Sequence, residues 1–391
     1  MNRGLITGGL ITALVALVCV SLTGTAFSQT PMYDPSARAM YKALPPHNYY
    51  PNQKPADPAV QLPQWTLSWL SSHNGHTYTS VFLGTDPQTS NATTTITVGI
   101  IPIKMVYGAS NGNMTFDPNT TGQFDGKYST TQMVNDSVIF QSIVDYNQGG
   151  TDLGKTQYED AYMRGNFWGS IQTNNKWHLM LKTVIGPEQT FTVPSSEGDV
   201  ISNPWSGIPT GTADINWFDA QLQAVMAKYS CAVIKEPCIG ANVLPLFITE
   251  NVYLTEGGCC IGGYHSANGP APSGQTYSYS TSIQQASIPV FSQDVGALAH
   301  EVGEWIMDPF TENASPCIND NTILEVGDPL ELDATFGDYP YTVQGFTFHP
   351  QDLVFLSWFG SPQSLTLSEW NGKPANVVTF QNENLTVCQV N

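Results

Sequence analysis

The 391-residue chain is acidic mainly because it has few basic residues: 13 Lys and Arg stand against 32 Asp and Glu, for a formal net charge of −19. Charged residues make up only 12% of the chain, and 41% of its residues are hydrophobic. A chain with so few cations and no basic patch is not expected to bind nucleic acid, because phosphate contacts need Lys and Arg. The length is that of about two domains.

Residues 1–28 have the pattern of a cleaved signal peptide. Arg3 supplies positive charge, an apolar run follows from Leu10 to Val20, and Ala26 and Ser28 form a small-x-small cleavage site. No later segment approaches about eighteen consecutive apolar residues, so the sequence predicts no stable membrane insertion. We therefore expect an exported protein, secreted or periplasmic. Nothing in the sequence assigns an oligomeric state.

The chain after the signal peptide divides by composition. Residues 29–64 are dense in proline and predict an extended arm rather than a packed domain. Residues 65–190 have the short alternating runs of a β-rich N-terminal domain. The elements that we expect there are a strand at 94–107 and helices at 131–144 and 157–167. A segment rich in proline and glycine, 186–209, predicts a loop at a domain boundary.

Residues 210–391 are expected to form a second domain. Its predicted elements are a helix at 217–229, a strand at 243–248, a polar, edge-like strand at 276–283 and a helix at 294–307. We therefore predict an α+β fold, with a β-rich N-terminal region followed by a C-terminal domain.

Six of the seven cysteines follow the predicted signal peptide, and an even number in an exported chain favours three disulfides. The pairings that we expect first are Cys231 with Cys238 and Cys317 with Cys388. Cys259 and Cys260 are neighbours in the sequence and are expected to bond to different partners. The alternative is a thiolate metal site, but the chain has no Cys-x-x-Cys pair.

The helix predicted at 294–307 contains the run His300-Glu301-Val302-Gly303-Glu304. His300 and Glu304 lie one above the other on a helix, so an imidazole and a carboxylate can reach one ion from the same face. Glu301 lies about 100° away, beside that ion. Asp294 is the expected N-cap. In the competing interpretation, His300, Glu301, Glu304 and Asp308 are the solvated face of an amphipathic helix.

This run resembles the motif of the zincin metallopeptidases, whose metal-binding helix reads His-Glu-hydrophobic-Gly-His, with Glu304 in place of the second histidine. Leu324-Glu325-Val326-Gly327-Asp328 also resembles the downstream Glu-x-x-Asp of the gluzincin branch. The resemblance covers roughly residues 210–350 and implies a zincin-like C-terminal domain with an active-site helix. It implies His300, Glu304 and Glu325 as metal ligands, with Asp328 orienting His300.

The chemistry implied by the resemblance is that of a metal-dependent peptidase. The metal, Zn²⁺ in most zincins, activates a water, and Glu301 accepts its proton as general base during attack on a peptide bond. His349 could stabilise the oxyanion, with Tyr339 or Tyr341 as substitutes. Two carboxylate ligands would weaken polarisation of the water and make Mn²⁺ or Fe²⁺ more competitive. The expected partner is a peptide or protein substrate.

Two alternatives stay open. His265, in a glycine-rich loop beside the cysteine pair, is an alternative ligand, although a disulfide-braced turn is the favoured explanation of that loop. The substitution at Glu304 also allows a non-catalytic exported binding or adhesion protein on a zincin-like scaffold. A peptidase should lose turnover on Glu301→Gln and keep its metal, whereas a binding protein has no turnover to lose.

Overall fold

The computed structural model describes residues 41–44, 61–148, 151–173, 176–203, 207–231, 238–284, 293–317, 323–331, 337–362, 378–381, 385 and 388. The predicted signal peptide and all of the proline-rich arm except 41–44 and 61–64 lie outside the described residues.

Strands outnumber helices in the described part of the chain. The strands are β1 Tyr41–Ala43, β2 Gln64–Leu70, β3 Thr77–Leu83, β4 Thr93–Tyr107, β5 Thr115–Phe116, β6 Val144–Gln148, β7 Thr151–Thr156, β8 His178–Ile185, β9 Gln189–Val193, β10 Val200–Ser202, β11 Pro209–Asp214, β12 Val243–Glu250, β13 Val252–Thr255, β14 Cys259–Ile261, β15 Gly263–Asn268, β16 Gln275–Ser282, β17 Tyr341–Val343 and β18 Phe346–Phe348. The α-helices are α1 Thr130–Asn135, α2 Tyr158–Asn166, α3 Trp168–Ile171, α4 Ile215–Tyr229 and α5 Gly296–Met307. This mixture agrees with the expected α+β class.

Several sequence predictions are confirmed closely, among them the strand at 94–107, the helices at 157–167 and 217–229, and the strand at 243–248. The helix expected at 131–144 is wrong beyond its first part, because α1 ends at Asn135 and Val144 already begins β6. The predicted boundary loop at 186–209 is also wrong in detail. It contains β9, which pairs with β4, and β10, which pairs with β11.

The largest sheet joins the two halves of the sequence. Its strand order is β1-β15-β16-β12-β4-β5, and β8 and β9 also pair with β4. Strand β4 from the N-terminal half lies parallel to β12 from the C-terminal half, with Ile100 opposite Leu246. The expected division into 65–190 and 210–391 is therefore not a division of this sheet.

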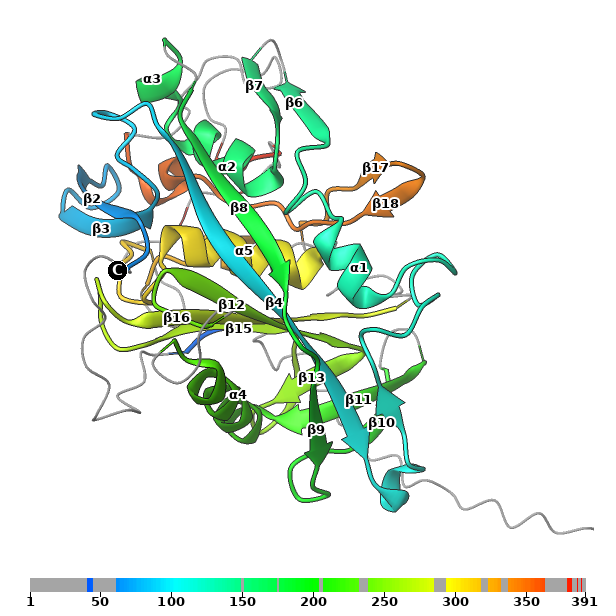
Figure 1. The fold of residues 1–391 in the computed structure, drawn as a ribbon. Helices are drawn as coiled ribbons and strands as arrows, with labels where there is room; N and C mark the ends of the chain where they lie inside the picture. The colour runs from blue at the N-terminus through cyan, green and yellow to red at the C-terminus, as the bar shows by residue number, and fades with distance from the viewer. Residues whose placement is uncertain are drawn as a thin grey trace, which may run out of the picture.

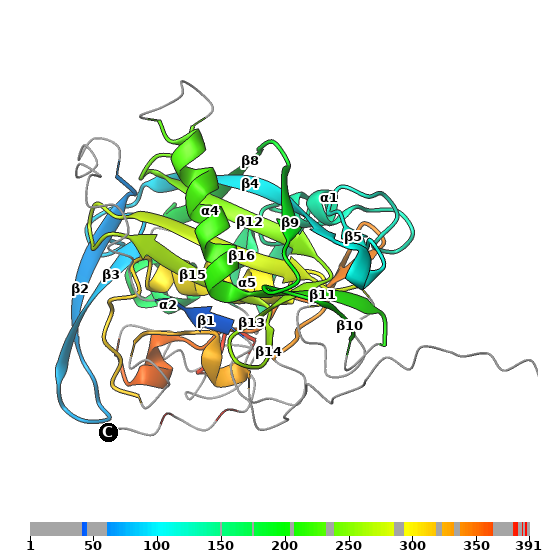
Figure 2. The ribbon, with the colours of Figure 1, turned by 90° about the horizontal axis from the view of Figure 1, so that it is seen from below.

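Helices α4 and α5 cover opposite faces of the sheet at β15 and β16 (Figures 1 and 2). Successive residues of these strands point to opposite faces of the sheet. Tyr277 and Tyr279 point toward α4, since Tyr277 donates to Asp219 at 2.7 Å and Tyr279 packs on Phe218. Thr276 points the other way and accepts a hydrogen bond from the Trp305 indole of α5 at 2.9 Å.

The prediction that 276–283 forms an edge strand is wrong. Strand β16 lies between β15 and β12, and every residue in it is buried. Its polarity has another cause: Thr276, Ser278 and Ser280 alternate with the tyrosines, so they share the face that α5 contacts. Small side chains there allow a helix to pack closely on the strand.

The three disulfides join Cys231 to Cys238, Cys317 to Cys388, and Cys259 to Cys260. The first two pairings confirm the prediction. The expectation that Cys259 and Cys260 bond to different partners is wrong. The other four of these six cysteines pair among themselves, and Cys259 bonds to Cys260. These bonds are compatible with an extracellular location. None of the described helices combines the length and the apolar character needed to span a bilayer.

Candidate metal centre

Helix α5 is buried on all sides. His300, Glu301 and Glu304 are each 0% exposed, and Asp308 is 1% exposed. The interpretation of these residues as a solvated helix face is therefore wrong. Burying several ionisable groups in one helix is costly unless they are paired or bind a cation, so their surroundings must supply a partner.

The predicted pair on one helix face is present. Nε2 of His300 lies 3.0 Å from Oε2 of Glu304, one turn further along α5. Oδ1 of Asp328, at the start of a short 3₁₀ helix (Asp328–Leu330), lies 3.6 Å from the same nitrogen. The three residues therefore present one nitrogen and two oxygens to a common point, as a metal site requires.

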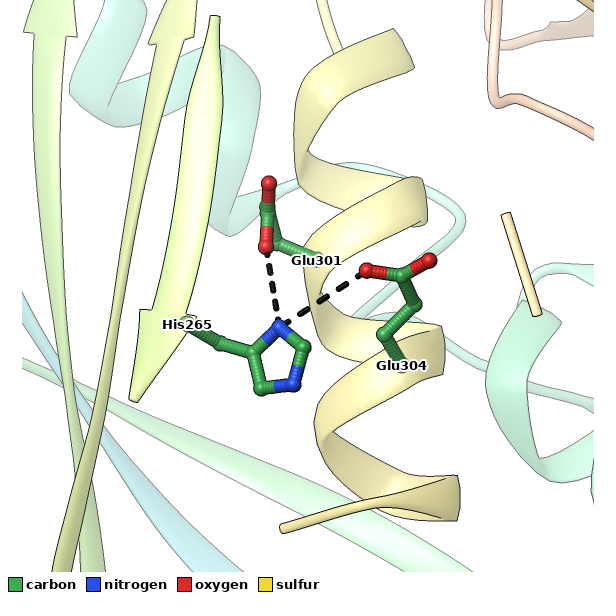
Figure 3. Close-up of side chains that lie close together, drawn as sticks. All are labelled: His265, Glu301 and Glu304. Atoms are coloured by element: carbon green, nitrogen blue, oxygen red, sulfur yellow. Dashed lines mark hydrogen bonds and ion pairs between the residues drawn. The ribbon is translucent and has the colours of Figure 1, made fainter. Parts of the chain in front are cut away.

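A second group of donors shares Glu304 with the first, and Figure 3 shows its three members, His265, Glu301 and Glu304. Nδ1 of His265 lies 3.2 Å from Oε2 of Glu301 and 3.7 Å from Oε2 of Glu304. All three residues are 0% exposed. His265 belongs to β15, where it alternates with Tyr264, whose hydroxyl reaches Asp219 of α4 at 2.9 Å. The alternation turns His265 to the opposite face, toward α5.

Oε2 of Glu304 belongs to both groups, and this shared oxygen connects them. It is buried, and no described residue forms a hydrogen bond with it. Nitrogen and oxygen donors about 2.1 Å from one ion lie roughly 3.0 to 3.4 Å apart. Oε2 of Glu304 lies 3.0 Å from Nε2 of His300 and 3.7 Å from Nδ1 of His265. The other two separations, 3.2 Å from Nδ1 of His265 to Glu301 and 3.6 Å from Nε2 of His300 to Asp328, are near the same spacing. Donors placed in this way could hold a divalent ion.

The position of Asp328 differs from its expected role. A residue that orients a metal-binding histidine contacts the nitrogen that faces away from the metal. Asp328 instead lies on the Nε2 side of His300, together with Glu304. Nδ1 of His300 lies 3.1 Å from Oε1 of Gln351, whose amide nitrogen donates to the carbonyl of Gly327 at 2.7 Å. Gln351 holds the ring, and no sequence signal pointed to it.

Glu325, the predicted third ligand, is 1% exposed and lies beside the carboxyl of Glu304, but it is not a member of either donor group. Burial, followed by the charges of Glu304 and Asp328, raises the pKa of Glu325 well above its usual value. Glu325 is therefore a neighbour of Glu304 that lies outside both donor groups, and its role as a ligand stays a prediction.

The other pKa shifts describe a cluster with excess negative charge. Burial, then Glu304 and Asp328, raises the pKa of Glu301 well above its usual value. Burial also raises the pKa of Glu304, but the charges of His300 and His265 outweigh it and lower that pKa to about 2. Burial lowers the pKa of His265 to about 4, so its ring is neutral at pH 7. Neutral imidazole and ionised carboxylate are the forms that bind metals.

Glycines hold the surrounding backbone against these side chains. A Cβ on Gly263 of β15 would stand 2.6 Å from Cγ of Glu301, and one on Gly327 would stand 2.3 Å from Nδ1 of His300. Gly303 on α5 leaves room for Leu353, whose Cδ1 would lie 2.4 Å from an added Cβ. A glycine in the middle of a helix costs about 1 kcal/mol relative to alanine, and the close approach of Leu353 gives Gly303 a packing reason.

His349, the predicted oxyanion group, lies outside both donor groups. Its Nδ1 is 2.5 Å from Oδ2 of Asp294, and its backbone N–H donates to Oδ1 of Asp294 at 2.8 Å. Burial lowers the pKa of His349, but the hydrogen bond and charge of Asp294 raise it above its usual value overall. The prediction that Asp294 caps the helix is wrong: Val295 is the N-cap, and Asp294 binds His349 instead.

The aromatic substitutes proposed for His349 are placed differently. Tyr341 packs edge-on against Tyr146 and Tyr158 in the hydrophobic core, and Tyr339 packs against Tyr341. Neither contacts the donor groups in any described interaction, and Tyr341 packs against the hydrophobic core.

Comparison with known proteins adds nothing to this site: no protein-family model, curated protein or solved structure matches the chain.

Proposed function

We propose that the chain binds a divalent metal ion through His265, His300 and Glu304, and that it is an exported metal-dependent peptidase in the manner of the zincins. The observation that carries the proposal is that two groups of donor atoms, His265 with Glu301 and Glu304, and His300 with Glu304 and Asp328, share the buried Glu304 carboxylate. Two imidazoles with one or two carboxylates form a donor set suited to Zn²⁺, and also to Mn²⁺ or Fe²⁺.

His265 offers the second imidazole that the motif helix lacks. In a zincin helix both imidazoles come from the helix itself, whereas here Glu304 takes the second position. Nδ1 of His265 reaches within 3.7 Å of the Glu304 oxygen from the neighbouring strand. A second neutral imidazole is therefore available, and the ligand charge is less negative than it would be for His300, Glu304 and Glu325.

The residues of the chain have distinct roles in this proposal. A bound ion would lower the pKa of a water ligand and polarise a carbonyl group. Glu301 is the base, since its carboxylate lies beside Nδ1 of His265 at 3.2 Å without belonging to the His300 group. His265, His300 and Glu304 hold the ion, Gln351 fixes the His300 ring, and Glu325 lies next to Glu304 as a proton carrier.

One observation favours a second candidate. His265, His300, Glu301 and Glu304 are all 0% exposed, whereas the side chain of Asp328 is 26% exposed. A site so thoroughly covered also suits a structural metal in a non-catalytic exported binding protein. Turnover distinguishes the two candidates.

The decisive experiment is elemental analysis of mature protein purified without chelator or affinity nickel. We expect close to one zinc, manganese or iron per chain, absent from His300→Ala/Glu304→Ala and retained in the control His76→Ala, which changes an exposed histidine. No metal in the wild type, even after reconstitution, would overturn the proposal. Glu301→Gln then separates the candidates: a peptidase loses cleavage of a peptide library and keeps its metal.

A further inference from the structure

Residues 41–44, which contain the short strand β1, are the only described part of the chain between residues 1 and 60, and they lie beside the candidate metal centre. Its three residues pair in parallel with β15, with Tyr41 opposite Gly263, Lys42 opposite Tyr264 and Ala43 opposite His265. Without β1, strand β15 would be the edge of the sheet, with backbone donors and acceptors free to pair with another chain.

The pairing register of β1 with β15 places β1 beside two side chains of the proposed site, His265 and Glu301. Ala43 pairs with His265 itself, and Gly263, opposite Tyr41, is the residue whose backbone presses on Glu301. The backbone N–H of Lys42 also lies against the Glu301 carboxyl. This interaction lowers the pKa of Glu301, in opposition to the larger effect of burial. Residues 41–43 therefore lie next to Glu301, the proposed general base, and next to the imidazole of His265.

The contacts of β1 are of the kind that bind a peptide by strand addition. The N–H of Leu44 donates to the carbonyl of His265 at 3.0 Å, and the Leu44 carbonyl accepts from the Thr311 hydroxyl at 3.1 Å. Lys42 forms an ion pair with Glu256, and Ala43 is 6% exposed. Backbone bonds supply affinity in such complexes, and side-chain pockets supply selectivity.

We propose that the outer edge of β15 is a peptide-binding groove of the metal centre and that residues 41–44 of the chain occupy it, which keeps the site closed. The inference rests on the proposed metal-dependent function and adds the class of ligand. The groove takes an extended peptide. A basic residue of the peptide lies opposite Tyr264 and pairs with Glu256, and the next residue, opposite His265, is small.

This assignment also explains the complete burial of the centre, because the chain's own strand is part of the cover. The Lys42 side chain is 23% exposed and that of Glu256 is 49% exposed, so this ion pair is the accessible end of the contact. A peptide in solution can compete there first.

The test uses the full mature chain and a fluorescein-labelled peptide with the sequence of residues 41–46, Tyr-Lys-Ala-Leu-Pro-Pro. Lys42→Glu places like charges at Glu256 and should release the strand. We expect this variant to bind the peptide at least about fivefold more tightly than wild type, the size of an exposed ion pair. The charge-swapped Lys42→Glu/Glu256→Lys should return to the weak binding of wild type. Lys104→Glu, which breaks a comparable ion pair on β4, is the matched control.

Leu44→Pro is an independent variant, because it removes the N–H that donates to His265 without changing any charge. It should also bind the peptide more tightly than wild type. In Lys42→Glu, a peptide with glutamate in place of lysine should bind more weakly than the native sequence. Three results would overturn the inference: equal peptide binding by wild type and by the two opened variants, Lys42→Glu and Leu44→Pro; no binding by any of them; or equal binding of the lysine and glutamate peptides.

Metal content, measured on the same samples, keeps the two proposals apart. If the protein contains metal but the variants bind the peptide no more tightly than wild type, the peptide-binding groove is disproved and the metal site is not. If the variants bind the peptide more tightly but the protein contains no metal, the proposed metal-dependent peptidase is disproved and the groove is not. If both proposals hold, the opened variants also cleave peptide substrates faster than wild type by a similar factor.

Discussion

Gly263 of β15 lies directly against Glu301 of α5: a Cβ at residue 263 would stand 2.6 Å from Cγ and 2.7 Å from Oε1 of the glutamate. The contact fixes the distance between the strand and the helix at the residue proposed as general base. It also means that the position of the Glu301 carboxylate depends on the absence of one methyl group.

Gly263→Ala should therefore displace Glu301 while leaving the fold intact. Overpacking of this kind costs about 1–3 kcal/mol of unfolding free energy, and we expect peptide turnover to fall at least about tenfold because the base moves. Urea unfolding and turnover measured on one preparation check both parts. Gly258→Ala is the matched control, since an added Cβ there meets nothing within 4 Å. Unchanged turnover in Gly263→Ala would argue against Glu301 as the base.

His265→Ala should weaken metal binding, because it removes one of the two proposed imidazole ligands. We expect a loss of at least about tenfold in affinity, or ~1.4 kcal/mol, measured by competition with a chromophoric chelator. His76→Ala, which removes an exposed histidine, should leave the affinity unchanged. An affinity equal to that of wild type in His265→Ala would restrict the site to His300, Glu304 and Asp328.

Glu304→His should keep or strengthen zinc binding, because an imidazole replaces a carboxylate and the ligand set becomes that of the zincin helix. Folding stability should fall by about 1 kcal/mol, since Oε1 of Glu304 accepts a hydrogen bond from Gly327 N at 3.0 Å. Zinc titration and chemical unfolding measure the two effects. Loss of all metal affinity in this variant would count against Glu304 as a ligand.

Glu159 of α2 predicts a pH dependence that is separate from the metal. It is 0% exposed, both its carboxyl oxygens lack a hydrogen-bond partner among the described residues, and burial raises its pKa well above the usual value. The folded state therefore binds this proton more tightly than the unfolded state does. The contribution to stability is fully present below the unfolded pKa and is lost as the pH rises toward the folded pKa.

Glu159→Gln should remove that loss. Relative to wild type, its free energy of unfolding should increase as the pH rises from about 5 to about 8, with a slope difference of at most about 1.36 kcal/mol per pH unit. Any offset from the new amide is independent of pH, so the slope is diagnostic. Urea unfolding at several pH values in the presence of chelator measures it; parallel curves for the two proteins would show that Glu159 is ionised when folded.

Local patterns in the sequence predicted much of the fold. The spacing of His300 and Glu304 predicted that both face one point, because four residues complete about one helical turn. Short runs of strand-forming residues located β4 and β12, and the cysteine spacing predicted two of the three disulfides. Each of these features depends on residues close together in the chain or on a count, which a sequence contains directly.

The tertiary structure alone decided which distant residues lie at the candidate site. His265 lies 35 positions before His300 and Gln351 lies 51 after it, and only the packing of α5 on β15 and the path of the loop after it bring them together. The same packing buries Glu304, sets Asp328 on the Nε2 side of His300 and turns the polar strand β16 into the sheet interior. Such contacts follow from sheet order and helix position, which the periodicity of one segment does not encode.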